Sequence, residues 1–229
     1  MTEPAESNRP IRSYVIRSGR LTESQRKALD EHWHNYVIDY SPQKLQLNDH
    51  FPNPGPLTVE IGFGMGDSLL AMAEAQPERN FLGIEVHRPG VGKLMHGINR
   101  LGLNNIKLMC HDATEVMANC FDAGSIDRIM VLFPDPWPKK RHNKRRIVQP
   151  EFATLLGTRL KKDGVLHLAT DWQAYAEHML EVLEDQSSLI NANGAAQYWD
   201  DPLRPPTKFE KRGQRLGHGV WDLLYRRVE

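Results

Sequence analysis

The stretch Glu60-Ile-Gly-Phe-Gly-Met-Gly66-Asp67 decides how the chain is expected to fold. It overlaps the end of a short apolar run, Leu57–Ile61, and begins a segment of helical composition, Asp67–Ala75. Glycines here let the backbone turn tightly and let a ligand approach the main chain. The motif therefore predicts a strand, a tight turn and a helix that together form a ligand site, with a purely structural turn as the alternative.

The glycine spacing restricts the kind of ligand. It is G-x-G-x-G, and Asp67 occupies the place of the third glycine of a dinucleotide-binding fingerprint. A carboxylate at the start of a helix opposes a pyrophosphate there. No G-K-[ST] follows, so the stretch is no phosphate-binding P-loop. We expect a nucleoside-like ligand without phosphates.

Strand-like and helical segments alternate on both sides of this motif. Such alternation is typical of a doubly wound α/β domain with a mostly parallel sheet. The predicted strands are Leu57–Ile61, Asn80–Glu85, Ile106–His111, Ile126–Phe133, Gly164–Thr170 and a closing strand at Val220–Val228. The predicted helices are Asp67–Ala75, Gly90–Leu101, Ala113–Asn119, Glu151–Lys161 and Gln173–Glu184.

The N-terminal part carries an arm and an added helix. Residues 1–20 are predicted to form a flexible basic arm, because four arginines and no acid lie between Arg9 and Arg20. Thr22 with Gln25 predicts a capping box that begins a helix, and Pro42 is expected to end it. Leu29, Trp33, Tyr36 and Tyr40 recur at helical spacing on one face, and the first three are expected to dock this helix on the domain.

Composition excludes several protein classes. The 229 residues are 40% apolar and 25% charged, which is ordinary for a folded soluble domain. Unbroken apolar stretches such as Ile129–Phe133 are far shorter than the roughly 20 residues of a membrane helix. Met1–Pro10 lacks the apolar segment of a signal peptide. Two cysteines, Cys110 and Cys120, make no disulfide framework, so a cytoplasmic, reducing location is expected.

Charge is balanced overall but concentrated locally. Residues 139–146 read KKRHNKRR and hold six of the 29 basic residues, leaving 23 basic against 29 acidic residues elsewhere. A second cationic stretch covers Arg204–Arg215. Such runs are either solvated surface or phosphate-contacting segments. Because the first one adjoins a candidate catalytic loop, phosphate contact is favoured there.

Acidic residues follow successive predicted strands. Glu60 and Glu85 end the first two, Asp112 follows the third, and Asp171 follows the fifth. The carboxyl ends of parallel strands meet at one sheet edge, where open α/β sheets bind ligands. A carboxylate at the position of Glu85 is suited to accept hydrogen bonds from ribose hydroxyls, and the residues around Asp112 to an adenine amino group. As isolated acids, each would be a surface or capping residue.

The loop after the fourth strand reads Phe133-Pro-Asp-Pro-Trp-Pro-Lys-Lys140. Its three prolines stiffen the chain and remove backbone donors. Asp135 and Trp137 then project from a rigid base, an arrangement that can stack a flat base and bond its edge. The alternative is a proline-rich turn with a solvated aspartate.

Taken together, these motifs resemble those of the bacterial tRNA (guanine-N7-)-methyltransferase family. The resemblance extends from about Ser13 to the C-terminus. The segments PDPWPKKRHNKRR (134–146) and TKFEKRG (207–213) are far more specific than the glycine motif. The segments that carry the resemblance are EIGFGMGD (60–67), GIEVH (83–87), FPDPWPKKRHNKRR (133–146), ATD (169–171) and TKFEKRG (207–213).

The resemblance implies a Rossmann-like class I methyltransferase fold over residues 21–229, with an antiparallel last strand. It implies transfer of a methyl group from S-adenosylmethionine to N7 of the variable-loop guanosine, position 46, of tRNA, with Asp135 as the catalytic residue. Implied cofactor contacts are Glu60, Gly62, Gly64, Gly66, Glu85, Asp112 and Asp135. Implied substrate contacts are Lys139, Asp171, Thr207, Lys208, Phe209 and Glu210. The implied RNA-contacting stretch is Arg141, His142, Asn143, Lys144, Arg145 and Arg146.

Two other functions would explain part of this pattern. A nicotinamide-dependent dehydrogenase shares the expected fold but would need the missing third glycine. A non-catalytic RNA-binding module would explain the cationic runs but not the acids at successive strand ends. The ten histidines show no metal-ligand spacing and no G-x-S-x-G is present, so we expect no metal. We expect tRNA as partner, a monomer or homodimer, and no membrane or obligate protein partner.

Overall fold

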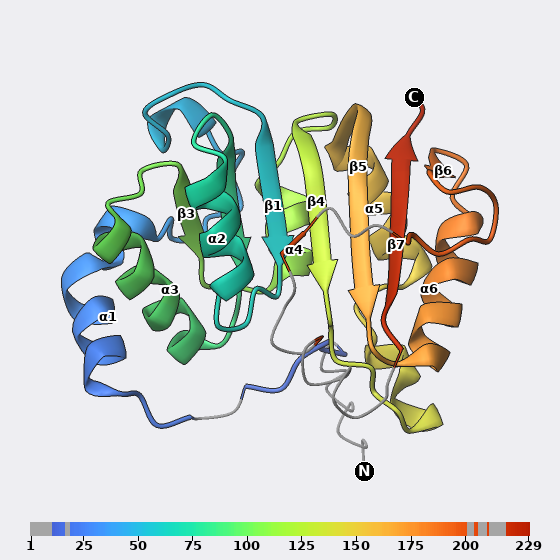
Figure 1. Cartoon of the computed structure of the whole chain (residues 1–229), viewed down its shortest axis with the longest axis horizontal. Coiled ribbons are helices and arrows are strands. Elements are labelled where there is room, and N and C mark those ends of the chain that lie inside the picture. The colour runs from blue at the N-terminus through green and yellow to red at the C-terminus, as the bar shows by residue number, and fades with distance from the viewer. Residues whose placement is uncertain (1–10, 17–18, 201–203, 206–209, 211–218) are drawn as a thin grey trace, which may run out of the picture.

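A seven-stranded sheet forms the centre of the molecule in the computed structural model (Figure 1). The structure describes residues 11–16, 19–200, 204–205, 210 and 219–229. Neighbouring strands are parallel from β3 to β5, whereas β7 runs antiparallel to both β5 and β6. In sheet order the strands are β3 (Ile106–Met109), β2 (Asn80–Ile84), β1 (Leu57–Ile61), β4 (Ile126–Leu132), β5 (Leu160–Thr170), β7 (Trp221–Arg227) and β6 (Leu189–Asn191).

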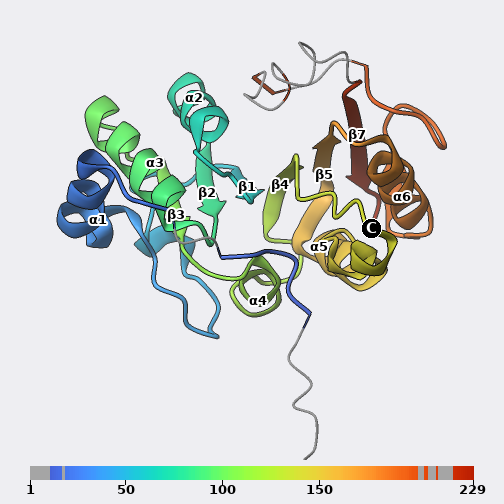
Figure 2. The ribbon, with the colours of Figure 1, turned by 90° about the horizontal axis from the view of Figure 1, so that it is seen from below.

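Helices cover both faces of the sheet, as Figure 2 shows in the view from below. α1, α2 and α3 lie on one face, and α4, α5 and α6 lie on the other. The α-helices are α1 (Glu23–Tyr36), α2 (Asp67–Ala75), α3 (Arg88–Leu101), α4 (Ala113–Asn119), α5 (Pro150–Arg159) and α6 (Gln173–Glu184). Short 3₁₀ helices are η1 (Leu47–Asp49) and η2 (Lys140–Arg145). This arrangement confirms the predicted doubly wound fold.

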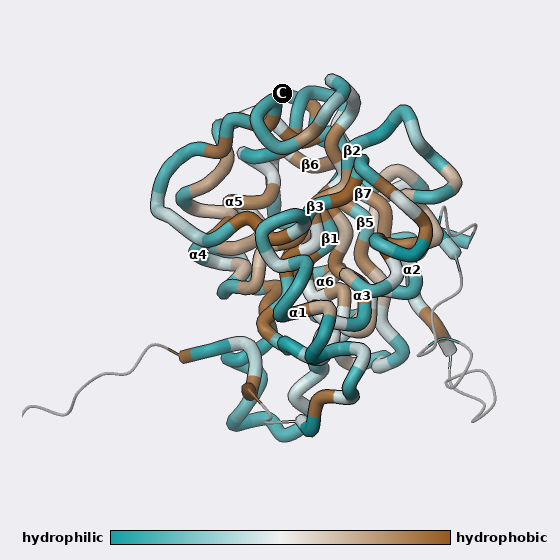
Figure 3. Tube along the Cα trace, turned by 90° about the vertical axis from the view of Figure 1, so that its left-hand side faces the viewer, coloured by the Kyte–Doolittle hydropathy of each residue, from teal (hydrophilic) through white to brown (hydrophobic). Residues whose placement is uncertain are grey.

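The core lies between the sheet and its two helical layers. Figure 3 shows hydrophobic segments gathered along the central strands and mostly hydrophilic segments around them. All residues of β1 and β2 are buried, as expected for parallel strands covered on both faces. The carboxyl ends of β1, β2, β3, β4 and β5 consequently share one edge, which lies at the bottom of Figure 1. No helix among the described residues is long and apolar enough to span a membrane.

The first helix ends earlier than Pro42 was expected to end it. Thr22 and Gln25 form the predicted capping box, but the helix stops at Tyr36. Val37 leaves the helical conformation and bridges Leu108 of β3, so a pairing with the sheet edge ends the helix. The three side chains expected to dock it, Leu29, Trp33 and Tyr36, pack on the domain core. Tyr40 lies beyond the helix and stacks on His111, 3.7 Å between ring centroids.

Candidate active site

A cavity of about 720 Å³ opens at the shared edge, beyond the ends of β1, β2 and β4. Its volume falls within the range of small-molecule sites. The predicted cofactor contacts that line it are Glu60, Gly62, Gly64, Gly66, Glu85 and Asp135. Asp112 is not among the lining residues, whereas its neighbours His111 and Ala113 are.

The glycine loop packs tightly under α3. Gly66 begins α2 with a φ of 74°, in the left-handed region, and a Cβ there would lie 2.7 Å from a methyl group of Leu94. A Cβ on Gly90 would lie 1.9 Å from the carbonyl oxygen of Gly64. Neither position can carry a larger residue without moving the backbone. The loop therefore presents main-chain groups to the cavity in a fixed conformation.

Glu85 holds this loop from the neighbouring strand. One carboxylate oxygen accepts a hydrogen bond from the amide of Gly64 at 2.9 Å. The other accepts from the amides of Val86 at 2.7 Å and His87 at 2.9 Å. A carboxylate has about four acceptor positions, so these three bonds orient it and leave capacity toward the cavity.

Glu60 is the buried acid of the cavity. Only 3% of it is exposed, and its Oε2 has no hydrogen-bond partner among the described residues. Burial raises the pKa of Glu60 to about 8, and the charge of Glu85 adds to this effect while Arg204 opposes it. A carboxyl in this environment is protonated at neutral pH. A cationic group that enters the cavity would lower this pKa and pair with the ionised carboxylate.

Asp112 caps a helix. Its Oδ1 accepts hydrogen bonds from the backbone amide of Thr114 at 2.9 Å and from the Thr114 hydroxyl at 2.7 Å. The bond from the Thr114 amide satisfies a backbone donor that would otherwise be unpaired at the start of α4, which is the common role of an aspartate at a helix N-cap. Asp112 also lies close enough to Tyr14, which lines the cavity, to help raise the pKa of the Tyr14 hydroxyl, although burial is the larger cause. Contact with adenine stays a prediction.

The loop after β4 holds Asp135 exposed at the cavity rim. Two non-glycine residues in it adopt the left-handed region, Phe133 with a φ of 51° and Trp137 with a φ of 46°. Such conformations persist only where the surrounding structure fixes them, and they cluster at functional sites. Here the amide of Phe133 donates to the carbonyl of Ala169 at 2.8 Å. The rigid base predicted from the prolines is thus reinforced by the neighbouring strand.

A segment from the N-terminus crosses to this loop. The indole of Trp137 donates to the carbonyl of Ser13 at 3.1 Å. The guanidinium of Arg145 lies 4.0 Å from the Trp137 ring centroid and donates to the carbonyls of Arg12 and Tyr14. Ser13 and Tyr14 line the cavity. Arg145, predicted as an RNA contact, therefore binds the protein's own backbone.

Arg146 is likewise used internally. It is only 5% exposed, and it donates to the carbonyls of Pro136 at 2.9 Å and Ala174 at 3.3 Å. Its guanidinium also lies 4.8 Å from the Tyr175 ring centroid. His142 and Asn143 are half-buried. The exposed cations of η2 are Lys140, Arg141 and Lys144.

The predicted substrate contacts do not form one cluster among the described residues. Lys139 is exposed at the start of η2. Asp171 lines a separate open hollow of about 550 Å³ together with Trp172 and Trp221. Glu210 is buried, and its Oε2 accepts from Arg204 at 2.6 Å. Thr207, Lys208 and Phe209 lie outside the described residues.

Sequence reasoning missed several residues of the site. Ser13, Tyr14 and His111 line the cavity, and Arg204 lies close enough to influence Glu60. His111 adjoins a strand end, a signal that could have found it. Ser13 and Tyr14 lie far along the chain from the motifs, and Arg204, although it begins the second cationic stretch, carried no signal that connects it to the cavity.

Comparisons with known proteins give the family. A family model described as "Putative methyltransferase" matches residues 54–223. A tRNA (guanine-N(7)-)-methyltransferase of Yersinia pestis (strain Pestoides F) is 51% identical over 228 residues, covering 99% of this chain and 95% of the relative. One of Shewanella amazonensis is 51% identical over 222 residues, covering 96% of this chain and 93% of the relative.

Solved structures agree on the fold. The aminoglycoside resistance methyltransferase NpmB1 aligns with a TM-score of 0.56 and 16% identity, over 81% of this chain and 95% of that one. The 16S rRNA methyltransferase KamB aligns with a TM-score of 0.55 and 13% identity, over 80% and 92%. These likenesses concern the Rossmann-like methyltransferase fold, whereas the sequence relatives are half identical over nearly their whole length. By this similarity the chain belongs to the bacterial tRNA (guanine-N7-)-methyltransferase family.

Proposed function

We propose that this protein transfers a methyl group from S-adenosylmethionine to N7 of the variable-loop guanosine, position 46, of tRNA. One observation carries the proposal: the glycine loop, the acids Glu60 and Glu85 and the proline-stiffened Asp135 surround a single cavity. The names of the half-identical relatives support the same substrate and the same atom. Family membership also weighs against the dehydrogenase and the non-catalytic RNA-binding module.

The cavity fits S-adenosylmethionine in its donor groups as well as its size. The unpartnered carboxyl of Glu60 is suited to the cofactor's cationic amino acid end. The oriented carboxylate of Glu85 is suited to the ribose hydroxyls. The glycine loop lies between these two acids and would contact the cofactor through its main chain. When bound there, the cofactor supplies an electrophilic sulfonium methyl group.

The reaction needs positioning more than proton transfer. Guanine N7 has an in-plane lone pair and no proton at neutral pH, so no general base is required. The task of the protein is to hold N7 in line with the methyl group, and such orientation alone can lower a barrier by several kcal/mol. The rigid loop that carries Asp135 is suited to this task.

Asp135 has two candidate roles at the rim. Methylation of N7 makes the ring cationic, and a nearby carboxylate stabilises the positive charge that develops. Alternatively, the carboxylate accepts from the guanine N1 and N2 hydrogens and orients the base. Both roles require an exposed carboxylate at the cavity mouth, which is where Asp135 lies.

The exposed cations of η2 would hold the tRNA backbone. Lys140, Arg141 and Lys144 follow the Asp135 loop directly, so a phosphate bound by them lies near the cavity mouth. Arg145 and Arg146 would act indirectly, since their guanidinium groups bind protein carbonyls. We therefore propose direct RNA contact for only these three exposed residues and not for the whole basic run.

A direct assay tests the proposal. Unmodified tRNA is incubated with labelled S-adenosylmethionine and the protein, and the nucleosides are then analysed. We expect 7-methylguanosine from the variable loop. A tRNA with 7-deazaguanine at that position should bind but accept no methyl group, because its backbone is unchanged while the acceptor atom is missing. Methylation of the deaza substrate at a normal rate would overturn the N7 assignment.

A further inference from the structure

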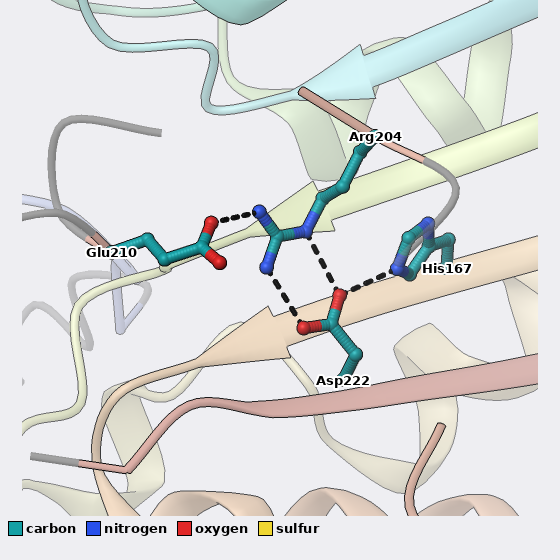
Figure 4. A network of polar contacts seen from close by, with 4 residues as sticks. All are labelled: His167, Arg204, Glu210 and Asp222. Atoms are coloured by element: carbon teal, nitrogen blue, oxygen red, sulfur yellow. Dashed lines mark hydrogen bonds and ion pairs between the residues drawn. The ribbon is translucent and has the colours of Figure 1, made fainter. Parts of the chain in front are cut away.

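Four charged or titratable side chains form a buried cluster (Figure 4). The guanidinium of Arg204 donates twice to Asp222, from Nε to Oδ1 and from Nη2 to Oδ2, both at 2.8 Å. Its Nη1 donates to Oε2 of Glu210 at 2.6 Å. The Nε2 of His167 lies 2.7 Å from Oδ1 of Asp222 on the far side. We call these residues, His167, Arg204, Glu210 and Asp222, the arginine cluster.

The arginine cluster is joined by hydrogen bonds between charged groups and is shielded from solvent. Its members are between 1% and 8% exposed. Burial alone would raise the pKa of Asp222, but hydrogen bonds from His167 and Arg204 together with their charges hold it below its usual value. A buried bidentate pair of this kind costs desolvation, so the same space filled by apolar side chains would often be at least as stable. The presence of the arginine cluster is therefore weak evidence for a purely stabilising role.

The arginine cluster joins parts of the chain that the proposed reaction uses together. Arg204 lies 5.2 Å from the ring centroid of Phe133, which begins the Asp135 loop and lines the cavity. The next residue, Pro205, lines the same cavity. Asp222 belongs to β7 and His167 to β5, so Arg204 is anchored on the sheet (Figure 4). One guanidinium thus contacts the start of the catalytic loop, the sheet and Glu210.

We propose that Arg204 is a positioning residue for methyl transfer, anchored by Asp222 and His167, which fixes the Phe133 ring and the Glu210 carboxylate in one arrangement. This inference rests on the proposed function. The planar guanidinium offers donors in fixed directions, so it can bind two carboxylates at once while stacking on an aromatic ring. A lysine ammonium keeps the charge but loses this geometry. Misplacement of a reacting group by about 1 Å can lower a rate about 100-fold.

The test compares Arg204→Lys with a matched control, Arg159→Lys. Arg159 also ties distant backbone together, since it donates to the carbonyls of Met117 at 2.9 Å and Ala118 at 3.0 Å. It is the last residue of α5, directly before β5 begins at Leu160, and so lies at the opposite end of that strand from the cavity. Measurements are the melting temperature, calorimetric affinity for S-adenosylmethionine, tRNA affinity, and the single-turnover rate of methyl transfer with saturating tRNA and cofactor.

For Arg204→Lys we expect a single-turnover rate at least tenfold lower, with tRNA and cofactor affinities within about threefold of wild type. Arg159→Lys should lower the melting temperature without changing that rate. If Arg204→Lys does not fold, Asp222→Asn carries the same expectation, because it keeps the shape of Asp222 and weakens its pairing with Arg204. His167→Leu leaves the Arg204 contacts in place and should slow the reaction less.

Two outcomes would overturn the inference separately from the proposed function. A folded Arg204→Lys protein that methylates tRNA at the wild-type single-turnover rate would show that Arg204 has a structural role only. A rate loss in Arg159→Lys equal to that in Arg204→Lys would show that any destabilisation slows the reaction. If wild-type protein makes no 7-methylguanosine, the proposed function itself fails.

Discussion

Replacing Glu60 with glutamine should stabilise the cofactor-free protein, and more strongly as the pH rises toward 8. In the unfolded chain this carboxyl ionises near its ordinary pKa of 4.5, whereas burial in the folded protein raises the pKa to about 8. Between these values the folded state holds a proton that the unfolded state has released. Folding stability therefore falls as the pH rises through this window, and the loss is complete above pH 8. Glutamine does not ionise and avoids it.

The size of the effect follows from the same two pKa values. Each pKa unit corresponds to about 1.36 kcal/mol, so the interval from 4.5 to about 8 amounts to roughly 5 kcal/mol. At pH 7 the part already lost is about 3 kcal/mol. For a domain of this size, that free energy corresponds to roughly 6–12 °C in Tm. Glutamine has nearly the same shape, so packing changes should be small beside this term.

The assay is thermal and urea unfolding of the cofactor-free wild type and Glu60→Gln at several pH values from 5 to 8. The difference in unfolding free energy should be small at pH 5 and grow by about 1.4 kcal/mol per pH unit. The control is Glu74→Gln, which changes an exposed glutamate of α2 and should shift stability little at any pH. A gap between wild type and Glu60→Gln that does not change with pH would refute the reasoning.

Three further predictions concern the proposed reaction. Asp135→Ala should lower the single-turnover rate by about 100-fold and tRNA affinity by less than twofold, and on inosine-containing tRNA the loss should shrink only if Asp135 binds the guanine N2 group. Replacing Lys140, Arg141 and Lys144 by alanine should lower the log–log salt slope of tRNA binding by about 2–3 and leave cofactor affinity unchanged; an unaltered slope would mean a solvated helix. Glu85→Ala should weaken cofactor binding about tenfold in calorimetry, and unchanged affinity in a folded variant would contradict the assignment.

Local sequence patterns predicted the strand and the helix on either side of the glycine motif well, because the apolar run and the glycine turn there mark the limits of both elements. The strand Leu57–Ile61 and the helix Asp67–Ala75 have the predicted limits. The first helix shows where local patterns fail. Its predicted end at Pro42 was wrong, because the bridge from Val37 to Leu108 joins residues far apart in sequence. The three-residue strand β6 is likewise too short to give a periodic signal.

Some residues of the candidate site could be predicted from local sequence patterns, and others could not. Acids at successive strand ends could be placed from the sequence, since parallel strands bring their carboxyl ends to one edge. The arginines could not. Arg146 and Arg204 both lie in cationic runs that favour an exposed location, yet both are buried. Their partners, the Ala174 carbonyl and the Asp222 carboxylate, come from distant elements that no local pattern connects to them.

The internal bonds of Arg145 and Arg146 have a consequence for the thermodynamics of tRNA capture. Fixing one backbone residue costs about 1–2 kcal/mol of conformational entropy, so an unstructured lysine-rich loop would lose part of its binding energy each time it became ordered on RNA. In η2 this ordering accompanies folding, because both arginines fasten the helix to the protein. Each cation–phosphate contact can then contribute to tRNA affinity without the entropy cost of ordering the loop on binding. A variant with residues 139–146 in shuffled order would keep the charge of this segment but bind tRNA more weakly.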